Sequence, residues 1–164
     1  MPPTLTIIAG VTVRASPERV WELAVDWPRQ REWIWATRTE GGHAPGAGVT
    51  ARTAIGPVGF TDTMVITDWE PPRRCVLTHT GPVVRGEGVF EVIPRGERSE
   101  FRWTERIVLP SPLPPALAGL AFPLIAPVAR LGLGSSLLRF ARLVEPRRRA
   151  DGGLLARIRI GSVR

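Results

Sequence analysis

Apolar and polar residues alternate over residues 5–15. One set of alternate positions is apolar, whereas Thr6, Thr12 and Arg14 are among the residues of the other set. Successive side chains of a strand point to opposite faces, so this alternation predicts a strand with one buried face.

The next segment has the spacing of a short amphipathic helix. Ser16 is suited to cap its N-terminus, and Pro17 fits the first helical position, where a missing N–H costs nothing. Apolar residues then recur at helical spacing, at Val20, Leu23, Ala24 and Trp27. A second short helical segment is predicted over residues 29–36.

From there to about residue 109 the pattern is one of strands and turns. Pairs such as Gly-Gly, Pro-Gly and Pro-Pro separate runs typical of strands at residues 49–55, 60–69, 75–80, 88–93 and 100–109. The connections are of hairpin length and contain no helix, which predicts one long, curved antiparallel sheet.

A longer helix is predicted over residues 128–144. Its apolar stripe consists of Leu133, Leu137, Phe140, Ala141 and Val144. Glycine and serine at residues 132 and 134–136 weaken its first half. These small residues either leave room for a ligand or allow close contact between helix and sheet. Six prolines between residues 107 and 129 exclude a continuous spanning helix there.

The positive charge lies entirely at the C-terminal end. All 22 cationic side chains are Arg, and the formal net charge is +7. Residues 1–127 hold 13 Arg and 13 acids, whereas residues 128–164 hold 9 Arg against Glu145 and Asp151. The absence of Lys, Asn and Tyr is typical of a GC-rich bacterial genome. The basic end either docks to an anionic membrane surface, with nucleic acid the less favoured partner, or is a solvated helix end and tail.

Three local motifs resemble those of a known superfamily. They lie at residues 15–21 together with 26–28 and 32–33, at residues 68–74, and at residues 101–105. Over residues 5–145 the chain resembles the START-like (SRPBCC) helix-grip superfamily, in its polyketide cyclase/dehydrase branch. The resemblance implies an α+β helix-grip fold, in which a curved antiparallel sheet of about six to seven strands, two short helices and a long C-terminal helix enclose an apolar cavity.

The resemblance also divides the chain into a helix-grip domain, residues 1–145, and a basic C-terminal tail, residues 146–164. We expect removal of this tail to leave the fold intact. The alternative is that residues 154–160, which alternate weakly between apolar and polar, pack on the domain. The single cysteine, Cys75, lies in an apolar run and is expected to be a buried small hydrophobe. The N-terminus has no pattern of a secretory signal, which favours a cytoplasmic location.

Two polar residues share a strand face with apolar ones. Glu105 lies two and four residues after Trp103 and Phe101, and His79 lies two and four residues after Leu77 and Cys75. Residues at this spacing point to the same face of a strand. If these faces point inward, both residues are candidates for acid–base catalysis in an apolar cavity. The alternatives are a Glu105 that lies at the cavity mouth or pairs with an Arg, and a satisfied histidine at the rim. His43 and His79 lie far apart in the sequence and show no ligand spacing, so neither a metal nor a cofactor is expected.

The candidate ligand-binding residues are mostly large and apolar. Trp33 and Trp35 are interpreted as lining an entrance, although tryptophans at such spacings also pack as core. The full candidate set is Trp33, Trp35, Thr63, Phe90, Trp103, Phe122, Leu133 and Leu137.

Three functions therefore stay open. The first is binding of a hydrophobic small molecule, such as a lipid or polyketide, in an internal cavity. The second is a polyketide cyclase/dehydratase that uses Glu105 and His79 as acid and base. The third is an interaction module whose basic tail docks to an anionic membrane or nucleic acid.

Overall fold

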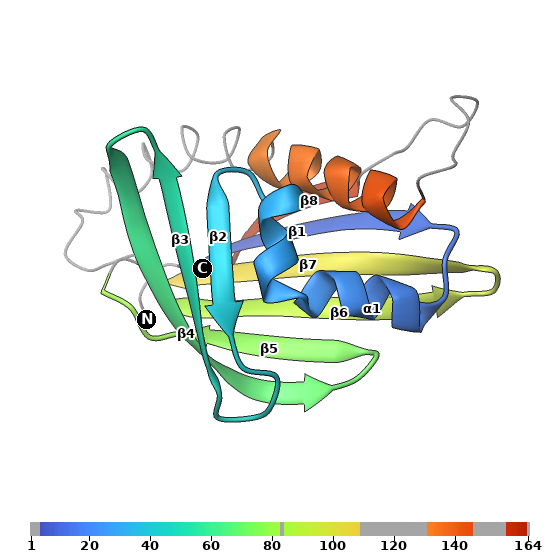
Figure 1. Cartoon of the computed structure of the whole chain (residues 1–164), viewed down its shortest axis with the longest axis horizontal. Helices are drawn as coiled ribbons and strands as arrows, with labels where there is room; N and C mark the ends of the chain where they lie inside the picture. Colours follow the sequence, from blue (N-terminus) through green and yellow to red (C-terminus); the bar gives the residue numbers. More distant parts are fainter. Residues whose placement is uncertain (1–3, 83, 109–130, 146–156, 164) are drawn as a thin grey trace.

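The computed structural model describes residues 4–82, 84–108, 131–145 and 157–163. Within these residues the strands are β1 (Thr4–Val13), β2 (Thr37–Gly41), β3 (Gly48–Ile55), β4 (Val58–Glu70), β5 (Arg74–His79), β6 (Gly86–Arg95), β7 (Arg98–Val108) and β8 (Arg157–Val163). They form one sheet in the order β2-β3-β4-β5-β6-β7-β1-β8 (Figure 1). Every neighbouring pair is antiparallel, as the hairpin-length turns predict.

Two short helices follow β1. Helix α1 (Pro17–Val25) is capped as predicted, because Ser16 Oγ accepts a hydrogen bond from the Arg19 N–H at 3.3 Å. The second segment is a 3₁₀ helix, η1 (Trp27–Glu32), that begins two residues earlier than predicted. Asp26 caps it by accepting from the Arg29 N–H at 3.3 Å. The strand β2 comes soon after and was not among the predicted runs.

The C-terminal helix, residues 131–144, lies over the same side of the sheet as α1 (Figure 1). Phe140 from this helix stacks on Phe101 of β7 with ring centroids 4.5 Å apart. Trp33 contacts Phe140 edge-on at 5.1 Å. All three side chains are completely buried. The sheet therefore packs on the helix through an aromatic core, which confirms the predicted α+β helix-grip fold.

The end of the chain departs from the prediction of a tail. Residues 157–163 form β8, which pairs with β1 from Thr4 to Gly10. Because strand pairing is a backbone interaction, a stretch with only weak apolar alternation can still form an edge strand. Residues 157–163 of the predicted tail therefore pair with the sheet, in line with the alternative that the weakly alternating residues 154–160 pack on the domain. Residues 146–156 lie outside the described residues.

Candidate functional site

A cavity of about 290 Å³ is lined by residues of β1 to β7, η1 and the C-terminal helix. Most of its lining is apolar. Met64, Leu77, Phe90 and Leu133 contribute side chains from four different elements. Such a mostly apolar hollow with a few polar groups is the usual form of a small-molecule site.

Strand alternation places the polar side chains of this cavity. On β4, Asp62 shares the inward face with Met64, and on β5 His79 shares it with Leu77. On β7, Glu105 lines the cavity together with Trp103 and Ile107. Each polar residue therefore occupies a position that the pleat directs inward, between apolar neighbours.

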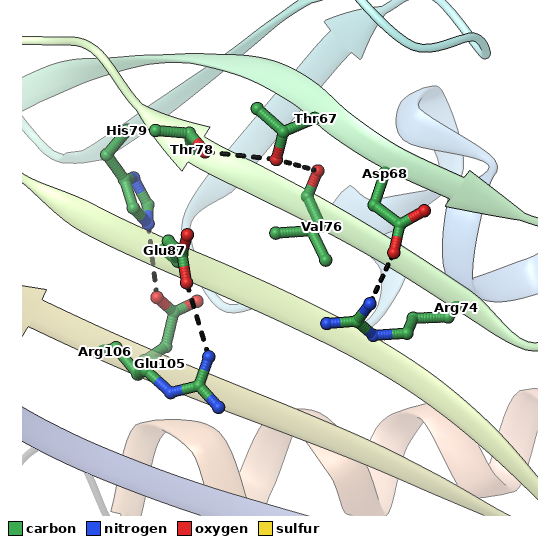
Figure 2. Close-up of polar contacts among 9 residues, drawn as sticks. All are labelled: Thr67, Asp68, Arg74, Val76, Thr78, His79, Glu87, Glu105 and Arg106. Atoms are coloured by element: carbon green, nitrogen blue, oxygen red, sulfur yellow. Dashed lines mark hydrogen bonds and ion pairs between the residues drawn. The ribbon is translucent and has the colours of Figure 1, made fainter.

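These side chains meet at a central histidine. His79 Nδ1 lies 2.7 Å from Asp62 Oδ2, and His79 Nε2 lies 3.3 Å from Glu105 Oε2. Trp103 donates its Nε1–H to Glu105 Oε1 at 2.5 Å. Figure 2 shows the His79 ring pointing toward the Glu105 carboxylate. We call Asp62, His79, Glu105 and Trp103 the polar cluster.

The carboxylates determine the protonation of His79. Burial by itself would lower the pKa of the imidazole, but the hydrogen bonds to Asp62 and Glu105 and the negative charges of both raise this pKa to about 9. At neutral pH the ring is thus an imidazolium between two carboxylates. One positive and two negative charges leave the cluster with a net charge of −1.

Two buried oxygen atoms of residues that line the cavity remain unpaired. Among the described residues, Asp62 Oδ1 and Thr39 Oγ1 have no hydrogen-bond partner. Asp62 is only 8% exposed and Thr39 only 7%. A buried polar atom without a partner costs free energy, so each of these two oxygens destabilises the folded protein.

Other polar groups of the lining are satisfied within the protein. Gln30 donates its side-chain N–H to Ala24 O at 2.9 Å. Thr37 Oγ1 donates to Trp35 O at 3.0 Å and lies 2.8 Å from Thr53 Oγ1. These bonds fix the side chains on the β2 and β3 side of the cavity.

The structure brings together five of the residues proposed from the sequence. His79, Phe90, Trp103, Glu105 and Leu133 all line the cavity. The alternation of residues along β5 and β7 therefore predicted the correct inward faces of these two strands.

Four other candidates do not line this cavity. Trp33 and Leu137 are completely buried in the core, and Trp33 packs against Phe90, Phe101, Trp103 and Phe140. Trp35 is 50% exposed. Thr63 is exposed because it lies between the inward-facing Asp62 and Met64. Phe122 lies outside the described residues.

Sequence reasoning missed Asp62, Thr39 and Gln30. Asp62 was detectable, since it alternates with Met64 and Ile66 in the same way that Glu105 alternates with Trp103. Thr39 lies on β2, a strand that was not predicted. Gln30 lies on η1, whose 3₁₀ geometry differs from the helical spacing assumed for that segment.

Comparison with known sequences assigns the chain to a family. Residues 5–145 match the family described as "Polyketide cyclase / dehydrase and lipid transport". The chain belongs to this family, which confirms the START-like resemblance. No match to a curated protein was found.

Solved structures share the fold at low sequence identity. The Zhui aromatase/cyclase from a Streptomyces species has a TM-score of 0.70 and 22% identity, over 92% of this chain and 99% of that one. A protein of Thermus thermophilus has a TM-score of 0.65 and 23% identity, over 88% and 99% of the two chains. A polyketide-cyclase-like protein of Corynebacterium glutamicum has a TM-score of 0.61 and 18% identity, over 93% and 100%.

In the part of the chain that the structure describes, no group of three or more His, Cys, Asp or Glu side chains is arranged to hold a metal ion. Nor does any helix in this part have the length and apolar character needed to cross a membrane.

Proposed function

We propose that the protein binds a hydrophobic small molecule, such as a lipid or polyketide, in the cavity that contains the polar cluster. The observation that carries this proposal is the cavity itself, about 290 Å³ with a mostly apolar lining. Transfer of apolar surface from water into such a cavity contributes roughly 25 cal/mol per Å², so the lining supplies the driving force for binding. Family membership supports the same class of ligand.

The direct experiment is solvent extraction of the purified protein followed by mass spectrometry, together with titration of a fluorescent apolar probe. The matched variants are Ala51→Phe and Thr50→Phe. Ala51 lines the cavity on β3, whereas the neighbouring Thr50 points to the other face of the strand and is absent from the lining. We expect the first variant to abolish probe binding and the second to leave it unchanged.

Equal probe binding by wild type and Ala51→Phe would show that the probe binds elsewhere. Absence of both an extracted ligand and probe binding would overturn the proposed function. The unfolding midpoint of each variant separates blocked binding from loss of fold.

A second candidate function, cyclisation or dehydration of a polyketide, is favoured by the polar cluster. In this mechanism the Glu105 carboxylate, which lines the cavity, accepts a proton from a methylene carbon beside a ligand carbonyl. The resulting carbanion attacks a second carbonyl to close a ring, and the alkoxide so formed takes the proton from Glu105 to become a hydroxyl. His79 Nε2 makes the longer of the two histidine contacts, 3.3 Å. In the dehydration step His79 Nε2 gives its proton to this hydroxyl, which leaves as water, while the Glu105 carboxylate takes the second proton of the same methylene carbon and the double bond forms. The proton on Glu105 then passes to His79 across the contact between them.

Glu105→Gln separates the two functions, because it retains the side-chain shape but removes the base. We expect an apolar probe to bind with equal or higher affinity, while any cyclase reaction slows by about 100-fold or more. Activity that survives this substitution would exclude Glu105 as the base.

A further inference from the structure

The turn that joins β3 to β4 carries an exposed apolar tip. Ile55, Val58 and Phe60 are 59%, 76% and 41% exposed. Ile55 and Val58 are Cα partners at the end of the hairpin, and residues 53–61 contain no charged side chain. Figure 1 shows this turn at the upper left, at one end of the sheet. A cluster of large exposed apolar side chains, unlike a single one, indicates an interaction surface.

The tip continues the apolar lining of the cavity. Thr53 and its Cα partner Phe60 line the cavity. Ile55 and Val58 are the next residues on the same face of the two strands, toward the turn. Phe60 therefore belongs both to the cavity and to the exposed tip, and an apolar surface leads from the tip to the cavity.

Trp35 lies beside this tip. The Ala36 carbonyl accepts a hydrogen bond from the Ala54 N–H at 3.0 Å, which holds this part of the chain next to the end of β3. The Trp35 side chain is exposed. Tryptophan combines a large apolar ring with a polar N–H and is enriched at the headgroup level of bilayers.

Two arginines occupy the outer face of β2 and β3. Arg38 and Arg52 are Cα partners and are both exposed, and the adjacent Thr39 and Ala51 point to the cavity instead. Neither arginine forms an ion pair within the described residues. Glu40, the next outer residue of β2, lies farther from the tip. Like charges on directly opposite residues destabilise a sheet, and an anion bound between them would offset this repulsion.

The spacing between the apolar tip and the arginines matches the surface of a bilayer. Arg52 precedes Ile55 by three residues, which in a strand is roughly 10 Å. Amphipathic elements at a membrane surface bury their apolar side chains roughly 5–10 Å deep. With the tip at that depth, both guanidinium groups reach the level of the lipid phosphates, which arginine binds in bidentate fashion. This favours a phospholipid surface over an apolar groove of another protein.

We infer that the β3–β4 turn docks to an anionic phospholipid bilayer, with its apolar tip among the lipid chains and Arg38 and Arg52 at the phosphates. Docking at this turn directs the cavity toward the bilayer, so an apolar ligand can pass between the two without crossing water. Passage of a ligand rests on the proposed function, whereas docking itself does not. This surface is separate from the basic residues 146–164.

Co-sedimentation with vesicles of phosphatidylglycerol and phosphatidylcholine in equal parts tests the inference. The double variant Ile55→Ser, Val58→Ser removes the apolar tip. We expect it to reduce affinity for the vesicles at least tenfold, because two side chains lose their burial in lipid. The matched control is Ile8→Ser, since Ile8 is also exposed but lies on β1, which three strands separate from β4. This control should bind as wild type does.

Arg52→Gln tests the contribution of charge. We expect it to weaken binding to the same vesicles about fivefold, because each cation near an anionic surface contributes to attachment. Added salt should weaken binding of this variant less than that of wild type. The matched control is Arg98→Gln, because Arg98 is exposed at the β6–β7 turn, at the other end of the sheet (Figure 1).

Val58→Cys labelled with an environment-sensitive fluorophore reports on docking directly. The only other cysteine, Cys75, is buried, so the label reacts at residue 58. We expect its emission to shift to the blue when the vesicles are added, whereas the same label on Ile8→Cys should show no shift. A shift at both positions, or at neither, would overturn the inference. Equal vesicle binding by wild type and the double variant would also overturn it, by assigning attachment to another surface. None of these results alters binding of the apolar probe, which tests the proposed function separately.

Discussion

Gly88 of β6 and Glu105 of β7 are Cα partners, and the Glu105 carboxylate fills the space where a side chain of Gly88 would lie. A Cβ atom on Gly88 would be 3.2 Å from Glu105 Oε1 and 3.5 Å from Oε2. The residue of β6 opposite His79 is also a glycine, Gly86. No β6 side chain therefore stands between His79 on β5 and Glu105 on β7, which is why two strands that are not neighbours share one ion pair.

Gly88→Ala tests this arrangement. The added methyl group would be 3.2 Å from Glu105 Oε1, so the carboxylate must give way by a few tenths of an ångström. We expect this movement to lengthen the 3.3 Å contact of Oε2 with His79 Nε2. Because that contact raises the pKa of His79, we expect this pKa to fall below its wild-type value of about 9. Proton NMR titration of the imidazole measures it directly.

Gly48→Ala is the matched control for this substitution. Gly48 begins β3, and a Cβ there would meet no atom within 4 Å. It should leave the pKa of His79 unchanged. An unchanged pKa in Gly88→Ala as well would mean that Glu105 can move without loss of its contact with His79.

The raised pKa of His79 predicts a pH-dependent stability. Protonated His79 is stabilised in the folded protein, where its pKa is about 9, relative to the unfolded chain, where it is about 6.5. Its contribution is therefore complete below about pH 6.5, provided both carboxylates are ionised, and is lost as the pH rises through 9. We expect about 2 kcal/mol, less than the full linkage value because solvent at the cavity screens the charges.

Urea unfolding of wild type and His79→Gln at pH 6.5, 8 and 10 measures this contribution. The difference in free energy of unfolding between the two proteins should shrink as the pH rises. A difference that stays constant across this range would show that His79 stabilises the fold by packing and not by its charge.

The sequence determined which side chains of a strand point inward, because apolar and polar residues alternate along it. Glu105 and His79 were assigned to inward faces because large apolar residues occupy the alternate positions, and burial of an apolar face fixes strand register. The same rule applied to β4 would have found Asp62. This alternation gives the direction of a side chain but not its partners. The ion pair between His79 and Glu105, which spans Gly86 and Gly88, could be predicted only with the order of the strands in the sheet as well.

Trp33 and β8 show where local pattern is insufficient. Trp33 is the C-cap residue that follows η1. The direction of a side chain at such a position depends on the element packed against it. Here that element is the C-terminal helix, about a hundred residues later in the chain. Pairing of β8 with β1 likewise joins the two ends of the chain, and nothing in the local composition of residues 157–163 specifies it.

Trp103 contributes both packing and a hydrogen bond, and two substitutions separate these roles. Its ring lies edge-on to Phe90 at 5.5 Å and to Trp33 at 5.9 Å. Trp103→Phe retains an aromatic ring but removes the donor to Glu105, which we expect to cost about 1 kcal/mol. Trp103→Ala should cost about 3 kcal/mol and weaken binding of the apolar probe.

Denaturant unfolding and probe titration of both Trp103 variants check these values. Equal destabilisation by the two substitutions would assign the whole effect to the hydrogen bond. If Trp103→Ala changes neither stability nor probe affinity, the indole contributes nothing to core or cavity.

The final prediction concerns β8, which replaces the expectation that the C-terminal end is dispensable. A chain that ends at residue 156 lacks β8 and leaves β1 as the edge of the sheet, so the backbone that β8 covers from Thr4 to Gly10 becomes open to solvent. We expect a loss on the order of 2–4 kcal/mol, since each backbone hydrogen bond contributes only about 1 kcal/mol and water replaces part of the loss. An open edge strand also favours pairing with a second copy, so dimers should form as the protein concentration rises.

The truncation also removes three positive charges, those of Arg157, Arg159 and Arg164. A full-length variant with Gln at these three positions serves as the control, because it loses the same charge but keeps the backbone of β8. Thermal unfolding and sedimentation distinguish the two effects. If the truncated protein unfolds at the wild-type midpoint and stays monomeric, β8 adds no stability, and β1 is a stable edge strand without it. If instead the Gln variant is as unstable as the truncated protein, the arginine side chains and not the strand pairing stabilise this end of the sheet.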